Sequence, residues 1–360
     1  MKYLLVIGDM TFGGAQRVMS NLANQLSCKH EIILVSIWKS NLAFNLSSQI
    51  NFINGIGCSS LYSAIFYLRS IIKKEHPSII LSFLSTYNIL TLLASFNLKI
   101  PIVVSERNDP KVEPRHIILK MLRKVLYPFA DGFVFQTAEA QNYFSKKIVK
   151  KSVVIPNPIF INKELNNLTI TKKKIIFSAG RLENQKNFKL LISAFSKIIN
   201  KFPSYQLHIY GQGRLKSELQ VQIDQLGLQD KVKLLGVTDD LHKFLKESEL
   251  FVLSSNHEGM PNILMEAMAL GVCCISTDCP CGGPRFLIKN DVNGFLFPIG
   301  DEDKLISLMD KILTDKDVRK RVSMEALKIY EDLNPILIVE QWDKYLYKTA
   351  NMNTVQNKKG

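Results

Sequence analysis

Short runs of apolar residues recur along the chain, and each is followed by a longer segment whose apolar residues are spaced as on one face of a helix. Strands that alternate with helices in this way are typical of βαβ units, in which a parallel sheet is covered by helices. The pattern therefore predicts an α/β fold. In the first half of the chain it predicts strands at residues 3–7, 32–36, 79–82, 102–105, 132–135 and 152–155.

The alternation is interrupted at residues 155–159, which read IPNPI. Two prolines around Asn157 exclude a helix or a central strand at this point. A polar segment at residues 161–173 then predicts a linker. The alternation resumes with strands expected at residues 174–178, 206–210, 232–235, 250–253, 272–276 and 294–297.

The predicted architecture is two Rossmann-like parallel-sheet domains, at residues 1–160 and 174–333. Loops at the carboxyl ends of the strands would line a central cleft, which is where open α/β sheets bind ligands. Residues 334–350 are expected to form an amphipathic helix that crosses back to the N-terminal domain. Residues 351–360 are expected to form a mobile polar tail.

Length and composition agree with two packed domains, since the chain has 360 residues, 46% of them hydrophobic and 22% charged. No apolar run reaches eighteen residues, so no membrane-spanning helix is expected. The N-terminal segment MKYLLVIGDMTFGG lacks a small-residue cleavage site, which favours a first strand over a signal peptide. The cysteines at positions 273, 274, 279 and 281 do not have the spacing of a zinc site, which predicts reduced thiols and no metal.

The net charge of +14 is concentrated in the first half, because residues 1–165 carry 19 Lys and Arg against 9 Asp and Glu. Such a basic half attracts nucleic acid, an anionic membrane or a phosphorylated substrate. No zinc finger, RNP-like strand or helix-turn-helix is recognisable, so no nucleic-acid partner is expected. Residues 116–127, HIILKMLRKVLY, mix apolar and basic residues as a helix at an anionic bilayer surface does. The alternative is an ordinary core helix with a solvated basic face.

The most informative candidate chemistry lies in residues 255–271, SNHEGMPNILMEAMALG, where Glu258 precedes an expected helix and Glu266 lies inside it. Pro261 suits the first helical position, and Gly259 lets the backbone approach a ligand closely. The N–H groups at the helix start would then point towards an anion; they belong to Asn262, Ile263 and Leu264. The alternative is that the first glutamate caps the helix and the second lies on a solvated face.

Glycine-bearing turns follow several expected strands. Gly13 and Gly14 lead from the first strand into a helix, where backbone N–H groups can reach a phosphate. Arg181 and Lys186 lie in one strand-end loop, GRLENQKN, and are able to neutralise a diphosphate as it leaves. The alternative is a surface loop with scattered charge. Gly211, in the turn YGQG, is expected chiefly to shape the backbone.

Together these motifs resemble the retaining family 4 glycosyltransferases of the GT-B fold, and the resemblance covers essentially the whole chain. The two glutamates of residues 258–271 are its most specific part. The stretches SERND and ISTDCPCGGPR are similar to those of enzymes that extend undecaprenyl-diphosphate-linked glycans. The motifs are GGA at 13–15, SERND at 105–109, VIPNPI at 154–159, GRLENQKN at 180–187, YGQG at 210–213, EGMPNILMEAMALG at 258–271 and ISTDCPCGGPR at 275–285.

The resemblance implies a role for each matched residue. Arg181 and Lys186 would bind the donor diphosphate and act in catalysis, Glu258 would contact the donor sugar, and Glu266 the ribose. The backbone from Gly259 through Met260, Pro261, Asn262 and Ile263 to Leu264 would support sugar and phosphate. Gly13, Gly14 and Gly211 complete the donor-binding set.

Glu106 is a further catalytic candidate, for orienting the acceptor or stabilising positive charge at the sugar. Its neighbour Arg107 stands where many relatives carry His, and an Arg cannot act as a base. The alternative role of Glu106 is a salt bridge with Arg107.

The implied activity is metal-independent, retaining transfer of GalNAc, GlcNAc or Gal from a nucleoside-diphosphate sugar, expected to be UDP-linked, with no cofactor. The implied acceptor is an undecaprenyl-diphosphate-linked glycan in O-antigen, capsule or exopolysaccharide synthesis, bound by the N-terminal domain. The expected location is the cytoplasmic face of the inner membrane. The competing hypotheses are a sugar-nucleotide epimerase and a non-catalytic protein that binds glycan or nucleic acid.

Overall fold

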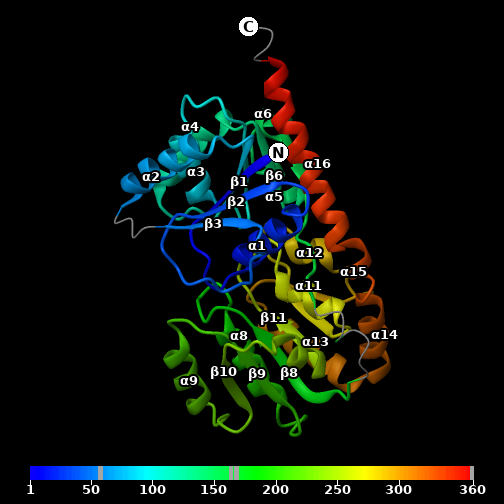
Figure 1. Cartoon of the computed structure of the whole chain (residues 1–360). Coiled ribbons are helices and arrows are strands. Elements are labelled where there is room, and N and C mark those ends of the chain that lie inside the picture. Colours follow the sequence, from blue (N-terminus) through cyan, green and yellow to red (C-terminus); the bar gives the residue numbers. More distant parts are fainter. Residues whose placement is uncertain (56–59, 162–164, 166–169, 357–360) are drawn as a thin grey trace. The chain divides into compact units, whose positions relative to one another are not determined.

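The computed structural model describes residues 1–55, 60–161, 165 and 170–356, and the chain divides into two compact units (Figure 1). The first unit combines residues 1–158 with the C-terminal helix, and the second spans Ile159–Asn334. Most of the linker predicted at residues 161–173 lies outside the described residues. Each unit is built around one sheet.

The first unit holds a seven-stranded, fully parallel sheet with the order β3-β2-β1-β4-β5-β6-β7. Its central strands are largely apolar: β4, β5 and β6 are buried along their whole length, and β1 is buried from Tyr3 onward, as expected for a sheet covered on both faces. The strands are β1 (Lys2–Ile7), β2 (Glu31–Ser36), β3 (Ile50–Asn54), β4 (Ile79–Phe83), β5 (Ile102–Ser105), β6 (Gly132–Phe135) and β7 (Ser152–Val154).

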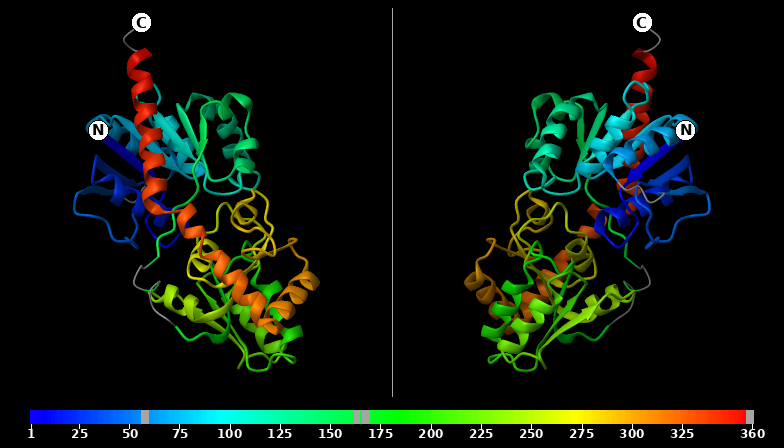
Figure 2. Two further views of the ribbon diagram at one scale, coloured as in Figure 1. Left: turned by 90° about the vertical axis from the view of Figure 1, so that its right-hand side faces the viewer. Right: turned by 90° about the vertical axis from the view of Figure 1, so that its left-hand side faces the viewer.

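Two groups of helices cover this sheet. Helices α1 and α16 contact each other, and α16 also packs on β4, while α2, α3 and α4 form a second layer in which each contacts the next (Figure 2). The helices of this unit are α1 (Gly14–Leu26), α2 (Leu61–Glu75), α3 (Ser85–Ala94), α4 (Ile117–Leu126), the 3-10 helix η1 (Tyr127–Phe129), α5 (Ala138–Asn142), α6 (Lys146–Val149) and α16 (Pro335–Gln356).

The second unit repeats the same topology with six parallel strands in the order β10-β9-β8-β11-β12-β13. Apolar residues of α8 and α13 interlock with the buried faces of the strands in one continuous core. The strands are β8 (Lys173–Ala179), β9 (Gln206–Tyr210), β10 (Val232–Gly236), β11 (Ser248–Leu253), β12 (Cys273–Thr277) and β13 (Phe295–Phe297). The helices are α8 (Phe188–Ile198), α9 (Lys216–Gln225), α10 (Leu241–Glu247), α11 (Asn262–Ala269), α12 (Gly283–Leu287), α13 (Glu302–Thr314), α14 (Lys316–Ala326) and α15 (Ile329–Asp332).

Both sheets have the strand order of a Rossmann fold, so the prediction of two Rossmann-like α/β domains is confirmed. In each sheet the order reverses between two neighbouring strands, β1 and β4 in the first unit and β8 and β11 in the second. Loops diverge at the carboxyl ends of such a pair and leave room for a ligand. The fold therefore directs attention to the loops that follow these four strands.

Two local features differ from the sequence prediction. Strand β3 was not predicted, because it lies at the sheet edge and only Ile50 among its residues is buried, which leaves no apolar run. Helix α16 continues to Gln356, since its helical backbone extends into the segment expected to be a tail. The rest of that segment lies outside the described residues.

Candidate functional site

The loops that follow β8 and β11 are joined to each other by hydrogen bonds at the point where the second sheet reverses its order. The Asn256 N–H donates to the carbonyl oxygen of Gln185 at 2.8 Å, and the Gln185 Nε2 donates to the carbonyl oxygen of His257 at 2.9 Å. The Asn187 Nδ2 donates to the Asn256 Oδ1 at 3.1 Å. These hydrogen bonds join the loop of residues 180–187 to the loop before α11, so that the two loops form one surface.

Lys186 and Glu258, which lie 72 residues apart in the chain, form an ion pair within this surface. The Lys186 Nζ is 2.6 Å from the Glu258 Oε1, and the side chains are only 13% and 9% exposed. The Ser255 Oγ donates to the same carboxylate oxygen at 2.7 Å. An ammonium has three donors, so Lys186 can hold Glu258 and still donate to an anion. The structure thus brings two of the predicted site residues together.

Arg181 lies in the same loop but is exposed to solvent. Its Nη2 donates to the Gln185 Oε1 at 3.4 Å, and it forms no ion pair with any described residue. Its guanidinium is therefore a second cation on this loop and, unlike Lys186, is not paired with a described carboxylate. Two cations on one loop suit a ligand with more than one negative charge.

Gly211 lies in the turn of residues 210–213, which packs closely against the loop that begins at Gly180. Its φ is +140°, and a Cβ at this position would lie 1.9 Å from the carbonyl oxygen of Gly180. Only glycine allows the two turns to approach this closely. This geometry accounts for Gly211 through the backbone, as the sequence predicted.

The start of α11 differs from the prediction in two ways. Pro261 is the N-cap with extended backbone (φ −77°, ψ 105°), and not the first helical residue, because α11 begins at Asn262. The Leu264 N–H donates to the carbonyl oxygen of Pro261 at 3.1 Å, so it is not directed at a ligand as predicted. Met260 and Gly259 are buried in the turn before the N-cap. Ile263 lies in the first turn of α11, half-buried.

Glu266 is 4% exposed on α11 and lies next to a residue that the sequence analysis did not select. The Nε2 of His242, on α10, is 3.0 Å from the Glu266 Oε2. The pair positions one carboxylate oxygen, and Glu266 does not lie on a solvated face. No side chain caps α11, so Glu258 is not a helix cap either. No periodicity or spacing in the sequence indicates His242, because the contact depends on the packing of α10 against α11.

Residues after β12 complete the surroundings of Glu258. The Cys279 Sγ donates to the carbonyl oxygen of Ser255 at 3.1 Å, and burial raises the pKa of this thiol to about 12. Cys281 has a left-handed backbone (φ +75°), and after it Gly283 lies so close to Gly259 that a Cβ would be 1.8 Å from that carbonyl oxygen. This segment therefore packs against the loop that carries Glu258. At pH 7 the Cys279 thiol is neutral.

The remaining predicted site residues lie in the first unit. Gly14 is the first residue of α1 and Gly13 its N-cap, at the carboxyl end of β1. The Gly13 backbone is extended, a conformation open to any residue, and a Cβ there would meet only the flexible side chain of Gln16. The backbone alone therefore does not require glycine at position 13.

Glu106 is buried at the carboxyl end of β5. The Ser85 Oγ donates to its Oε2 at 2.6 Å, and the Tyr127 hydroxyl donates to its Oε1. Burial raises the pKa of the Glu106 carboxyl above its usual range. Among the described residues no ion pair joins Glu106 to Arg107, so the alternative of a salt bridge between them is wrong.

Arg107 instead occupies an aromatic pocket of the first unit. Its guanidinium carbon lies 4.6 Å from the ring centre of Phe83 and 5.9 Å from that of Trp342, and an amino group donates to the Asn157 Oδ1. Burial lowers the pKa of Arg107 to about 9. The side chain thus links β5 to the Pro-Asn-Pro break and to α16.

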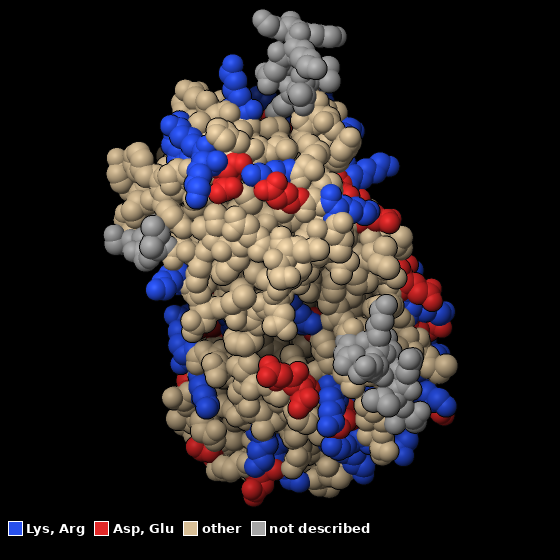
Figure 3. All heavy atoms as spheres, viewed as in Figure 1, with Lys and Arg blue, Asp and Glu red and all other residues tan. Residues whose placement is uncertain are grey.

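Helix α4 and the 3-10 helix η1 that follows it carry an exposed apolar face, which we call the α4 patch: Ile117, Ile118, Met121, Val125 and, in η1, Phe129, each between 57% and 71% exposed. Arg123 is the buried residue of α4. The alternative of an ordinary core helix is therefore wrong. Figure 3 shows basic side chains beside uncharged surface in the region where Figure 1 labels α4.

Among the described residues, no three His, Cys, Asp or Glu side chains gather in the way that a metal ion requires. None of the described helices combines the length and the hydropathy needed to cross a bilayer.

Comparisons with known proteins agree with this geometry. Residues 12–163 match the family model described as Glycosyltransferase Family 4, and residues 161–328 match the one described as Glycosyl transferases group 1.

Two relatives have names that state their activity. The chain is 28% identical over 363 residues, 98% of this chain and 99% of the relative, to the GalNAc-alpha-(1->4)-GalNAc-alpha-(1->3)-diNAcBac-PP-undecaprenol alpha-1,4-N-acetyl-D-galactosaminyltransferase of Campylobacter jejuni. It is 28% identical over 317 residues, 82% of this chain and 80% of the relative, to the UDP-Gal:alpha-D-GlcNAc-diphosphoundecaprenol alpha-1,3-galactosyltransferase of Escherichia coli.

Solved structures share the fold. Anabaena HepE in complex with UDP-glucose superposes with a TM-score of 0.81 at 18% identity, over 97% of this chain and all of that one.

Proposed function

Because this chain belongs to the family 4 glycosyltransferases and has two Rossmann-like domains, we propose that it is a retaining, metal-independent hexosyltransferase that uses a nucleoside-diphosphate sugar. The observation that carries the proposal is the Lys186–Glu258 pair at the point where the second sheet reverses its order. This is the position at which Rossmann-like sheets bind nucleotides. The second unit is therefore the donor domain in this proposal.

Each charged group of the site has one task. Lys186 and Arg181 bind the diphosphate, and their positive charge takes the place of a metal ion as the leaving group develops negative charge. Glu258, held by Lys186 and Ser255, accepts hydrogen bonds from hydroxyls of the donor sugar. Glu266, oriented by His242, accepts those of the ribose.

The transfer step keeps the configuration at the anomeric carbon. The acceptor oxygen forms a bond to this carbon on the face from which the diphosphate departs, and the bond between the carbon and the phosphate oxygen breaks. The proton of the acceptor hydroxyl passes to the departing phosphate oxygen, so no basic side chain is required. Lys186 stabilises the same phosphate as its charge increases.

The named relatives support the choice of substrates. Their names state transfer of GalNAc or Gal to glycans linked to undecaprenol through a diphosphate, and one names UDP-Gal as donor. We assign a UDP-linked GalNAc, GlcNAc or Gal as donor to this chain and an undecaprenyl-diphosphate-linked glycan as acceptor. Its product would enter a surface polysaccharide.

A lipid-linked acceptor lies at a membrane, and the α4 patch is the proposed contact with it. The apolar residues of the patch would enter the headgroup region, and Lys120 and Lys124 on the same helix would contact anionic lipids. Flotation with phosphatidylglycerol vesicles tests this assignment. Met121→Ser together with Val125→Ser should reduce the floated fraction, and Val221→Ser, at an exposed site on α9, is the matched control.

The activity itself is tested with purified protein, undecaprenyl-diphosphate-linked acceptor and three donors, UDP-GalNAc, UDP-GlcNAc and UDP-Gal, in the presence of EDTA. We expect transfer from one donor, with an α linkage in the product by NMR. A β-linked product would exclude retention, and a requirement for added metal would exclude metal independence. Interconversion of the donor sugar without acceptor would indicate an epimerase instead.

A further inference from the structure

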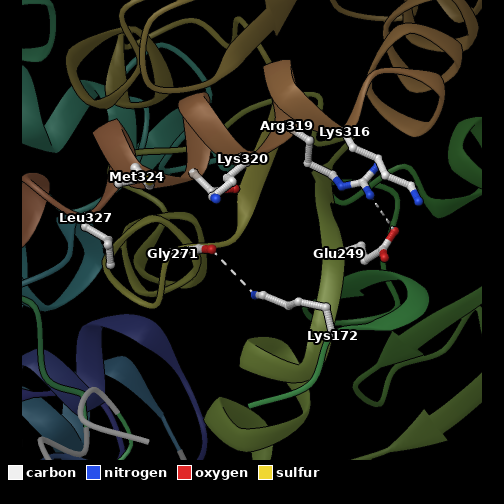
Figure 4. A pocket seen from close by; sticks show the side chains of 9 residues that line it. Lys172, Glu249, Gly271, Lys316, Arg319, Lys320, Met324 and Leu327 are labelled. Atoms are coloured by element: carbon white, nitrogen blue, oxygen red, sulfur yellow. Dashed lines mark hydrogen bonds and ion pairs between the residues drawn. The ribbon is translucent and has the colours of Figure 1, made fainter. Parts of the chain in front are cut away.

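The amino-terminal edge of the second sheet holds a cavity of about 310 Å³ that has no part in the donor site (Figure 4). Lys172 precedes β8, Glu249 lies at the start of β11 and Gly271 precedes β12, while α14 provides the opposite wall. The donor loops follow the carboxyl ends of the same parallel strands. A strand of six or seven residues separates the two edges by roughly 20 Å. The cavity is therefore a separate site.

The lining of the cavity is strongly basic. It contains four cationic side chains and one carboxylate: Lys172, Lys316, Arg319, Lys320 and Glu249. The carboxylate is already neutralised, because the Arg319 Nη2 lies 3.1 Å from the Glu249 Oε2 and both side chains are largely buried. Three lysine charges are left around the cavity.

None of these lysines forms an ion pair with a described residue. The Lys172 Nζ donates to the carbonyl oxygens of Lys246 at 2.8 Å and Gly271 at 3.5 Å, and Figure 4 shows it directed towards the cavity. Desolvation of this ammonium group and the nearby charge of Lys246 lower the pKa of Lys172 to about 8. The side chains of Lys316 and Lys320 make no hydrogen bond with any described residue. An anion in the cavity would stabilise all three charges.

One wall of the cavity is apolar. Met324 and Leu327 belong to its lining and are 59% and 44% exposed. Leu327 also packs on Gly271, where a Cβ would lie 3.1 Å from the Leu327 Cδ2. A ligand that pairs a negative group with a small apolar group would cover both kinds of surface. The volume lies at the lower end of the range for small-molecule sites.

We propose that this cavity is a second ligand site, which binds a phosphate monoester that carries a compact apolar substituent. A phosphate offers several acceptor oxygens to lysines that approach from α14 and from the strand edge, which a carboxylate does less well. The substituent lies against Met324 and Leu327. A soluble phosphate ester and phosphatidic acid, a lipid whose headgroup is a phosphate monoester, share the phosphate chemistry.

Phenyl phosphate is the probe for the soluble form. Its binding is measured by calorimetry with saturating UDP present, so that the donor site is occupied. Wild type should bind one equivalent, and Lys320→Glu should bind at least about tenfold more weakly, because it reverses a charge that lines the cavity. The fold should not change, because Lys320 forms no ion pair with any described residue. Lys304→Glu, an exposed substitution on α13 outside the cavity, is the matched control and should bind as wild type.

Sedimentation with phosphatidylcholine vesicles, with and without phosphatidic acid, tests whether the bound phosphate belongs to a lipid. A loss of binding in Lys320→Glu that appears only with phosphatidic acid assigns the phosphate to a lipid. Met324→Ser should weaken binding of phenyl phosphate but not of inorganic phosphate. Equal binding by wild type, Lys320→Glu and Lys304→Glu in both arms overturns the proposal, as does the absence of saturable binding up to about 10 mM. Sugar transfer by these variants is a separate measurement, so failure here leaves the donor-site proposal intact.

Discussion

Replacing Lys186 by Met removes one charge of the central ion pair while keeping most of the side-chain volume. The Lys186 Nζ lies 2.6 Å from the Glu258 Oε1, with both side chains nearly buried. The substitution leaves Glu258 with the Ser255 hydroxyl as a hydrogen-bond donor and with no ion pair to any other described residue. The consequences for stability and for ligand binding can therefore be separated.

Breaking a buried pair by removing one partner costs about 3–5 kcal/mol, because a charge is left uncompensated. Here a small exposed fraction remains, so we expect a loss of about 3 kcal/mol in the free energy of unfolding. Adding Glu258→Gln removes the uncompensated charge, so the double variant should be more stable than Lys186→Met alone. For ligand binding, one charge-assisted hydrogen bond contributes about 1.5–3 kcal/mol. UDP should therefore bind roughly 10- to 150-fold more weakly.

Urea unfolding followed by circular dichroism measures the first effect, and calorimetry with UDP measures the second. Glu258→Gln provides the contrast, because UDP lacks the transferred sugar that this residue is proposed to contact. We expect its UDP affinity to stay within about threefold of wild type, while sugar transfer falls by orders of magnitude.

Lys189→Met is the control, since Lys189 pairs with Glu218 at an exposed position on neighbouring helices. Such pairs contribute about 0.2–1 kcal/mol, and UDP affinity should be unchanged. If Lys186→Met binds UDP as tightly as the control does, the ammonium does not contact the diphosphate and the assignment fails. If the double variant is less stable than Lys186→Met, the carboxylate is not the source of the lost stability.

Three further predictions concern other residues of the chain. Arg181→Ala should weaken UDP binding roughly tenfold with little change in unfolding, because this side chain is exposed; calorimetry and urea unfolding test both parts. His242→Phe should raise the KM for the donor more than it lowers kcat, since it disturbs only the orientation of Glu266, and equal effects on both constants would contradict this role. Burial raises the pKa of Glu106 above 4.5, so the folded protein keeps a proton that the unfolded chain has lost. The free energy of unfolding should therefore fall as pH rises from 4.5 through the raised pKa, and Glu106→Gln should flatten this part of the curve, measured by the fluorescence of the two tryptophans, both in the first unit.

The architecture was largely predictable from the chain alone. Strands such as β4 and β12 are buried along their whole length, and a continuous apolar run between helical segments identifies a strand of this kind. The edge strand β3 was missed because only Ile50 is buried and polar Asn residues interrupt its apolar positions. The pattern of neighbouring residues therefore predicts buried strands more readily than exposed ones.

The candidate site was predictable only as a set of motifs. Lys186 and Glu258 were both selected, but nothing local indicates that they form a pair, because the contact exists only where β8 and β11 lie side by side. His242 was missed for the same reason, since α10 and α11 belong to different segments of the chain. The sequence suggested a salt bridge between Glu106 and its neighbour Arg107, whereas in the fold Glu106 accepts hydrogen bonds from Ser85 and Tyr127.

The sequence by itself determined the parallel strands, the break at the Pro-Asn-Pro segment and the types of residue available for a charged ligand. These properties depend on burial, backbone restriction and side-chain chemistry, which are set residue by residue. The tertiary structure decided which charges are paired, which glutamates are buried and which helix exposes its apolar face. Those outcomes depend on distances between segments that are remote in the chain, and only the packing of the sheets and helices sets these distances.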